Sequence, residues 1–306
     1  MIYKLIPTCK DYIWGGTRLK TDWAKKSESD IIAETWELSC HDDGPSYFED
    51  GTTLKAHIDA NPAAAGSVCE RFEDFPMLIK LIDAKQNLSI QVHPSDEYAR
   101  KFEGQNGKTE VWYVVDCDDD AFIYYGLNKD VSAEEFAAAI ENDTVTDILN
   151  KVDVKAGDVY FIPSGTIHAI GAGCLIAEVQ QNSNVTYRVY DYGRLGVDGQ
   201  PRELHVQKAC DVTILEKSAA QPDFGAHMSS CEYFTADLMD VKADEVSTIM
   251  ADATSFKHIL VLAGAVSVSA GETEIALVKG ESAFVDAGTG EVSFKGDGKV
   301  LISYIK

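Results

Sequence analysis

Four side chains with the chemistry of metal ligands lie in three separate segments of the chain. In the segment LSIQVHPSD, Gln91 and His93 alternate with apolar residues, and such alternation is typical of a β-strand. Side chains two residues apart on a strand share a face, so we expect this amide and this imidazole to project together. Glu110 and His168 offer two further donors downstream. Donors of these types suit zinc, iron or manganese, and if the four converge the chain builds an open metal site.

Spacing alone leaves a structural explanation open, because a single histidine in a strand is more often hydrogen-bonded than metal-bound. His93 and His168 differ through their context, since one follows Gln91 in a strand and the other follows the turn beginning at Pro163. For the remaining histidines we expect structural roles; these are His41, His57, His205, His227 and His258.

The composition is that of a globular, cytoplasmic protein that binds neither nucleic acid nor a membrane. The 306 residues are 45% apolar, enough for one large domain or two of ordinary size. The formal net charge of −23 argues against nucleic acid, whose phosphates need a basic surface. No apolar run is long enough for a membrane span, and the N-terminus lacks the layout of a signal peptide. The seven cysteines contain no CxxC pair, so we expect reduced thiols.

Short strands dominate the predicted secondary structure and favour an all-β barrel or sandwich of the jelly-roll type. They are rich in β-branched and aromatic residues and are bounded by Gly, Asp, Asn or Pro. In the first part of the chain we expect strands at Met77–Ile82, Leu88–His93, Val111–Asp116, Ala121–Tyr125, Asp158–Ile162, Leu175–Gln180 and Val185–Tyr190.

A few helices are predicted between these strands. Ser132 and Glu135 have the spacing of a capping box ahead of an apolar run. Ser95 is placed to cap a helix with acidic residues in its first turn. Shorter helices are expected to begin at Pro62 and after Thr144.

A polar segment, Glu216–Gly225, is predicted to link two halves of the chain. Beyond it we expect strands at Tyr233–Val241, Phe256–Leu262, Val266–Ser269, Glu274–Leu277, Ser282–Val285, Glu291–Phe294 and Val300–Ile305. A weak internal repeat lays residues 155–170 over 278–293, with Gly157 on Gly280. In this overlay His168 falls on Glu291. We therefore expect a second barrel that lacks the metal.

Several ordered segments resemble type I mannose-6-phosphate isomerases in their shorter bacterial form. They are IKLIDAKQNLSIQVHPSDEYA, GKTEVWYVVD, GDVYFIPSGTIHAI and QQNSNVTYRVYDYGR, with DYIWGGTRL and ETWELS nearer the N-terminus. The resemblance implies a mainly β fold of two cupin (jelly-roll) barrels with a few inserted helices. It implies a catalytic metal-binding cupin domain over residues 1–215 and a degenerate, metal-free one over residues 226–306. The implied ligands of a single zinc ion are Gln91, His93, Glu110 and His168.

The activity that this resemblance implies is the interconversion of mannose 6-phosphate and fructose 6-phosphate. A proton must move between two sugar carbons through an enediol(ate), while a metal acts as a Lewis acid. Arg188 matches the family's active-site arginine and is predicted to stabilise the oxyanion or bind the anion, with stacking on Tyr187 or Tyr190 as the structural alternative. Lys108 matches the family's lysine and, two residues before Glu110, would point towards the metal.

Two positions depart from the family pattern. Gly107 stands where longer relatives place a histidine, and Asn184 stands where members often carry an acidic residue. Asn184 therefore cannot be a carboxylate base, and we retain it as a substrate-binding residue. Glu178 is a candidate proton shuttle or, alternatively, a partner that orients a ligand histidine. The predicted catalytic residues are Arg188, Lys108 and Glu178.

Two other functions remain open at this point. Two histidines and a carboxylate on a barrel also describe non-haem iron dioxygenases. A sugar-sensing or inactive double-cupin protein that binds a sugar phosphate is the non-enzymatic alternative. Lys108 and Arg188 favour a small phosphorylated substrate, and we expect the protein to be a monomer or a homodimer.

Overall fold

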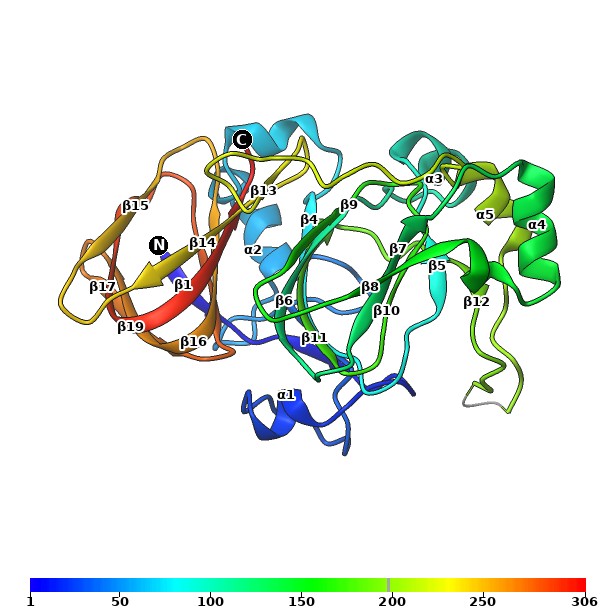
Figure 1. The fold of residues 1–306 in the computed structure, drawn as a ribbon. Helices are drawn as coiled ribbons and strands as arrows, with labels where there is room; N and C mark the ends of the chain where they lie inside the picture. Colours follow the sequence, from blue (N-terminus) through cyan, green and yellow to red (C-terminus); the bar gives the residue numbers. More distant parts are fainter. Residues whose placement is uncertain (197–198) are drawn as a thin grey trace.

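The computed structural model describes residues 1–196 and 199–306 and shows a mainly β protein, which confirms the predicted fold class (Figure 1). Its named strands form three antiparallel sheets of eight, five and six strands. The five- and six-stranded sheets belong to the first part of the chain, and the eight-stranded sheet is built mainly from the last part. In the described part of the chain no helix is long and apolar enough to cross a membrane.

The five-stranded and six-stranded sheets face one another across a buried apolar cluster. The cluster takes Val114 and Ile176 from one sheet and Ile123 and Ile170 from the other. In order, the six-stranded sheet contains β2 (Thr8–Lys10), β3 (Glu34–Leu38), β4 (Met77–Asp83), β11 (Cys174–Gln181), β6 (Glu110–Cys117) and β9 (Val159–Ile162). The five-stranded sheet contains β12 (Tyr187–Tyr190), β5 (Ile90–Val92), β10 (His168–Ile170), β7 (Phe122–Leu127) and β8 (Leu149–Asp153).

Helices cover the outer side of the five-stranded sheet (Figure 1). Ile90 and Val92 of β5 pack there against Phe136 of α4 (Ala133–Glu141) and Ala209 of α5 (Val206–Val212). Because Ile90 and Val92 face outwards, the alternation of the strand turns Gln91 towards the interior. The predicted alternation is therefore correct, although β5 is shorter than the predicted strand.

The predicted helix starts are confirmed at two positions and modified at two others. Ser132 and Glu135 form the capping box of α4, and the Ser95 side chain caps α3 (Asp96–Phe102). The segments at Pro62 and after Thr144 form single 3₁₀ turns, η1 (Pro62–Ala64) and η3 (Val145–Ile148). The remaining helices are α1 (Arg18–Thr21), α2 (Leu54–Ala60) and η2 (Ser67–Arg71).

The eight-stranded sheet contains two strands that are longer than predicted. β16 (Lys257–Ala270) and β19 (Gly290–Tyr304) each run through a glycine-containing stretch that we expected to separate two strands. The pairing register shifts between Val261 and Ala263, beside Gly264 with a φ of +71°, so this glycine marks an irregularity within one strand and not a turn. The other strands are β1 (Ile2–Leu5), β18 (Ser282–Val285), β14 (Thr235–Val241), β13 (Ser229–Ser230), β15 (Ser247–Ala251) and β17 (Thr273–Val278).

The weak internal repeat has a structural counterpart. Gly157 and Gly280 both adopt positive φ, +96° and +89°, a region that glycine enters without steric cost. A strand of four residues begins two positions after each glycine, β9 in the first half and β18 in the second. The boundaries predicted for the two domains remain a prediction, and β1 of the N-terminal segment pairs with β18 of the C-terminal sheet.

Candidate metal centre and active-site cavity

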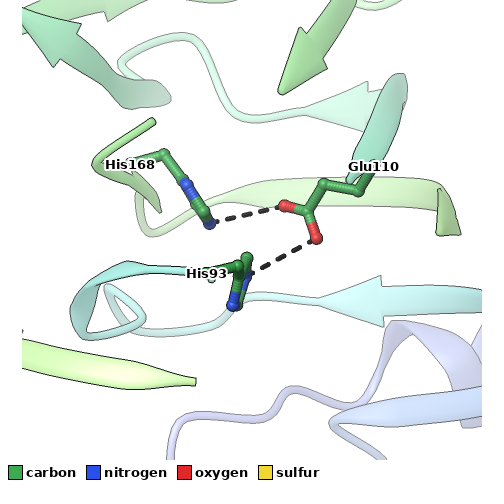
Figure 2. A group of neighbouring side chains, drawn as sticks. All are labelled: His93, Glu110 and His168. Carbon is green, nitrogen blue, oxygen red and sulfur yellow. Dashed lines mark ion pairs between the residues drawn. The ribbon is translucent and has the colours of Figure 1, made fainter. Parts of the chain in front are cut away.

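His93, Glu110 and His168 converge between the five-stranded and six-stranded sheets (Figure 2). His93 directly follows β5, Glu110 begins β6 and His168 begins β10. His93 Nε2 lies 3.7 Å from Glu110 Oε2, and His168 Nε2 lies 3.4 Å from Glu110 Oε1. One ligand atom from each of the three residues lies within 4.8 Å of the others, and all three side chains are buried.

The backbone fixes the orientation of both imidazole rings. His93 Nδ1 is 2.8 Å from the carbonyl oxygen of Val185, and His168 Nδ1 is 2.8 Å from that of Thr166. A carbonyl oxygen only accepts, so each Nδ1 carries the hydrogen and each Nε2 presents a lone pair. Burial lowers the pKa of His168 to about 4, which keeps this ring neutral and able to bind a cation at neutral pH.

The donor atoms at this point lack protein partners. His93 Nε2, His168 Nε2 and Glu110 Oε1 are buried without a hydrogen bond, and leaving buried polar atoms unpaired is costly. A metal ion bound by two nitrogens and a carboxylate would satisfy all three atoms. The residues present therefore fit a metal site, and no other group of three such side chains was found in the described ranges.

Gln91 lies beside this centre on the strand between His168 and Arg188. In the sheet it pairs directly with His168 on β10 and with Arg188 on β12. Directly opposed residues in antiparallel strands project to the same face, so these three side chains share the interior face. Gln91 and Arg188 both line a cavity of about 290 Å³. The role of Gln91 as a metal ligand stays a prediction.

Buried charges form the wall of the cavity on the six-stranded sheet. Lys108 Nζ lies 2.8 Å from Glu110 Oε2 and 3.6 Å from Glu178 Oε1. Lys80 Nζ lies 3.6 Å from the same Glu178 oxygen and 3.5 Å from Glu34 Oε2. Burial raises the pKa of Glu178, but the two lysines outweigh this effect and lower it overall. Glu178 is therefore held ionised beside two cations.

Glu178 orients neither ligand histidine, which excludes one of its two predicted roles. Its Oε2 accepts a hydrogen bond from Trp112 Nε1 at 2.8 Å, and its Oε1 faces the two lysines. Since it lines the cavity, its candidate role as a proton shuttle is still open.

Lys80 is one site residue that sequence reasoning missed. It is 4% exposed and lines the cavity from the middle of β4. Burial lowers its pKa, but the carboxylates of Glu34, Glu178 and Glu110 outweigh burial and raise it overall. A lysine inside the apolar run MLIKLID was the available signal, since buried lysines are rare unless paired.

Arg188 and Asn184 line the same cavity. Arg188 Nη1 donates to the carbonyl oxygen of Glu203 at 2.9 Å, and its Nε is buried without a partner. Tyr187 belongs to the buried cluster on the opposite face of β12, which argues against stacking on that ring as the role of Arg188. Asn184 is exposed and donates to Asp43 Oδ2 at 3.2 Å, so a carboxylate from another segment contacts the amide that replaces the family's acidic residue.

A larger cavity lies away from these groups. Its volume is about 690 Å³ and it neighbours α2 and η2. Its titratable lining is mainly acidic, namely Asp42, Asp43, Asp59, Glu70, Glu73 and Asp74. This lining would repel an anionic substrate, so we assign the chemistry to the smaller cavity.

Comparisons with known proteins place the chain in a family. Residues 2–119 match the model of the type I phosphomannose isomerase catalytic domain, and residues 225–305 match that of the mannose-6-phosphate isomerase cupin domain. The chain is 35% identical to mannose-6-phosphate isomerase ManA of Bacillus subtilis (strain 168), over 98% of this chain and 97% of that protein. The chain belongs to the mannose-6-phosphate isomerase family.

Further members of the family extend this relationship along the whole chain. Mannose-6-phosphate isomerase of Streptococcus mutans is 34% identical over 95% of this chain and 94% of its own length. The crystal structure of the Bacillus subtilis mannose 6-phosphate isomerase superposes with a TM-score of 0.91 at 34% identity, covering 99% of both chains. The enzymes of the family are aldose–ketose isomerases.

Proposed function

We propose that the protein is a zinc-dependent isomerase that interconverts mannose 6-phosphate and fructose 6-phosphate through an enediol(ate). The observation that carries the proposal is the convergence of three buried, unpartnered donor atoms from His93, Glu110 and His168 in a family of such isomerases. A solved mannose 6-phosphate isomerase of the same fold, with a TM-score of 0.79 and 20% identity, is bound with zinc and yttrium. That structure supports zinc as the metal.

His93, Glu110 and His168 would hold the zinc, with Gln91 as the fourth predicted ligand. When bound, zinc would supply Lewis-acid stabilisation of the negative charge that develops on the substrate oxygens. Two neutral histidines and one carboxylate cancel only one of the two charges of a zinc ion. The loaded site would therefore keep a net positive charge, which suits an oxyanion.

The groups that we expect to act in the proton transfer line the cavity. Lys108 Nζ lies 3.6 Å from Glu178 Oε1 and, together with Lys80, keeps this carboxylate ionised. The ionised Glu178 carboxylate would take the proton from one sugar carbon and return it to the neighbouring carbon. Lys80 lies 3.6 Å from the same Glu178 oxygen and compensates its charge when the pair is ionised.

Arg188 supplies a permanent cation on the same face as Gln91 and His168. Its unpartnered Nε is available to an anionic group of the substrate. The two histidines and one carboxylate would also suit a non-haem iron oxygenase, but Lys108 and Arg188 favour a phosphorylated substrate.

The test is a coupled assay on mannose 6-phosphate with metal analysis of the same sample. We expect about one zinc per chain, loss of isomerase activity on treatment with a chelator, and recovery when zinc is added back. Absence of isomerisation in a sample that contains stoichiometric zinc would refute the proposal.

A further inference from the structure

Three arginines and one carboxylate form a cluster at the active-site cavity. Arg202 donates to Asp191 through Nε and Nη2, each bond 2.6 Å long. Arg194 also pairs with Asp191, and Arg188 lines the cavity beside Arg202. Two guanidinium groups thus share one buried carboxylate, and the third lines the cavity beside one of them, in a protein whose net charge is −23.

The electrostatics of this cluster leave room for an anion. Burial lowers the pKa of Arg188, and the neighbouring Arg202 lowers it further, because two nearby cations repel. The carboxylates of Asp191 and Glu203 act in the opposite direction. Asp191 is already shared by Arg194 and Arg202, and Glu203 is exposed. The cluster therefore keeps an excess of positive charge.

The hydrogen-bonding capacity of the cluster is also incomplete. Arg188 Nε is buried and has no partner, and its Nη1 is engaged by a backbone carbonyl. Asp191 occupies the Nε and Nη2 edge of Arg202, so the guanidinium is oriented while its charge still faces the cavity. Fixed, planar guanidinium groups are well matched to the oxygens of a phosphate.

We propose that Arg202 and Arg188 together bind the phosphate of the sugar phosphate, with Asp191 as the residue that positions Arg202. This inference rests on the proposed function and adds a specificity-determining residue to it. Gln91 pairs with Arg188 across the strands, so the phosphate end of the cavity adjoins the metal end, and the sugar carbons lie between them.

The test compares Arg202→Gln with Arg202→Lys and with a matched control, Arg100→Gln. Arg100 is an exposed arginine of α3 that pairs with Glu73. For Arg202→Gln we expect KM for mannose 6-phosphate to rise about tenfold or more, the usual loss for a hydrogen bond to a charged group. We expect kcat to stay within about threefold, since the reacting carbons are not contacted. Arg202→Lys, which keeps the charge but loses the fork, should lie between wild type and Arg202→Gln, and Arg100→Gln should match wild type.

Binding of inorganic phosphate, measured by calorimetry on the zinc-loaded protein, separates this inference from the proposed function. We expect phosphate to bind wild type and to bind Arg202→Gln at least about tenfold more weakly. An unchanged KM and unchanged phosphate affinity in Arg202→Gln would overturn the assignment, as would a fall in kcat at constant KM. If wild type binds phosphate at Arg202 but does not isomerise mannose 6-phosphate, the proposed function fails and the phosphate site stands.

A second, independent inference concerns two cysteines that oppose each other across β6 and β11. Cys117 and Cys174 are direct partners in this antiparallel pairing. The flanking pair is hydrogen-bonded, with Asp118 N donating to the carbonyl oxygen of Gly173 at 3.0 Å, so the cysteines occupy the closer, non-hydrogen-bonded position, where Cα atoms are about 4.5 Å apart. This spacing falls within the range that a disulfide spans.

Both thiols also contact backbone carbonyls of the neighbouring β7–β8 pair, at the start of β7 and just after β8. Cys117 Sγ lies 3.6 Å from the carbonyl oxygen of Val154, and Cys174 Sγ lies 3.6 Å from that of Phe122. Cys117 is partly exposed and Cys174 is buried. We infer that a low-molecular-weight disulfide can oxidise this pair. Cys117 attacks the reagent and releases one thiol, and Cys174 then attacks the mixed disulfide on Cys117, forming the cross-strand bond and releasing the second thiol.

The test is incubation of the holoenzyme with oxidised glutathione at pH 8.5, followed by alkylation and non-reducing peptide mapping. We expect two of the seven cysteines to resist alkylation and a Cys117–Cys174 peptide to appear. Cys174→Ser should stop at a mixed disulfide on Cys117, whereas Cys117→Ser should leave Cys174 as a thiol. Full alkylation of all seven thiols, or a different linked pair, would overturn the inference.

Discussion

The two halves of the molecule each contain a fully buried histidine, and only one of these histidines belongs to a reactive centre. His168 begins β10, and His258 lies within β16; both are 0% exposed. His168 has a backbone carbonyl at Nδ1 and the Glu110 carboxylate facing Nε2. Neither ring nitrogen of His258 has a hydrogen-bond partner among the described residues. Burial alone therefore does not make a histidine a candidate metal ligand. The metal centre is distinguished by an oriented ring that faces a carboxylate.

The internal repeat extends this comparison to the backbone. After matching glycines, β9 and β18 have the same length and the same offset from the turn. The position equivalent to His168 is Glu291 in the second half, and this side chain is exposed. The two halves therefore share a local backbone framework, while the donor atoms converge only in the first.

The largest expected effect comes from replacing His168. His168→Ala should lower isomerase activity by more than about 100-fold, since loss of an outer-shell partner alone costs about 10- to 100-fold. Zinc content should fall in parallel. The matched control is His258→Leu, which removes the buried histidine of the other half and should keep zinc content and activity near wild type. Equal losses in the two variants would contradict the distinction drawn between the two histidines.

Arg188→Ala separates loss of the metal from loss of the anion partner. Because Arg188 shares a face with His168 but is not among the converging donors, we expect kcat/KM to fall by about 100-fold, as for loss of charged hydrogen bonds to the phosphate. Zinc content, measured on the same sample, should remain near one per chain. A zinc-free Arg188→Ala protein would show that this arginine supports the metal centre itself.

His258 should make stability depend on pH. Burial lowers the pKa of His258 to about 3 from an ordinary value of 6.5, so between these values the unfolded chain binds a proton that the folded chain does not. Its contribution is fully present above pH 6.5 and is lost as the pH falls towards 3, about 2 kcal/mol at pH 5. Urea unfolding at pH 7.5 and pH 5, with metal removed at both, should show a smaller pH-dependent loss in His258→Leu than in wild type. An identical loss in both proteins would show that His258 is protonated without cost.

The smallest effect is expected for a histidine introduced at the repeat-equivalent position. Glu291→His should leave zinc at one per chain, because no carboxylate and second histidine converge there. As an exposed substitution it should change the free energy of unfolding by no more than about 0.5 kcal/mol. Metal analysis and urea unfolding check both statements, and a second zinc per chain would show that the two halves differ less than we infer.

The sequence was sufficient for the fold class and for most of the donor set, for physical reasons visible in particular residues. Alternation around Gln91 and His93 reports directly which side chains share a face. Convergence of Glu110 and His168 with them depends on how two sheets face each other, and no local pattern encodes that; the family resemblance supplied it. Arg202 lies outside the motifs that carry the resemblance, and it lines the cavity with its guanidinium bonded to Asp191.

The sequence was less informative where glycine has more than one structural use. Gly264 was expected to end a strand, yet it adopts positive φ within β16 while the chain continues in the same direction. Lys80 illustrates the opposite difficulty, since its apolar neighbours identify the strand but conceal the charge that its partners stabilise.

The pairing of β1 with β18 has a consequence for the order in which the protein can be assembled. The two strands are separated by almost the whole chain, with Ile2 paired to Val285. During synthesis β1 therefore leaves the ribosome long before its partner exists, and it has to wait as an unpaired strand. Contacts of such long sequence separation are slow to form. The C-terminal strands must therefore be synthesised before β1 can pair. Completion of the C-terminal sheet is thus a late step in the folding of the whole chain. Until then β1 is an unpaired strand at which two nascent copies can mispair.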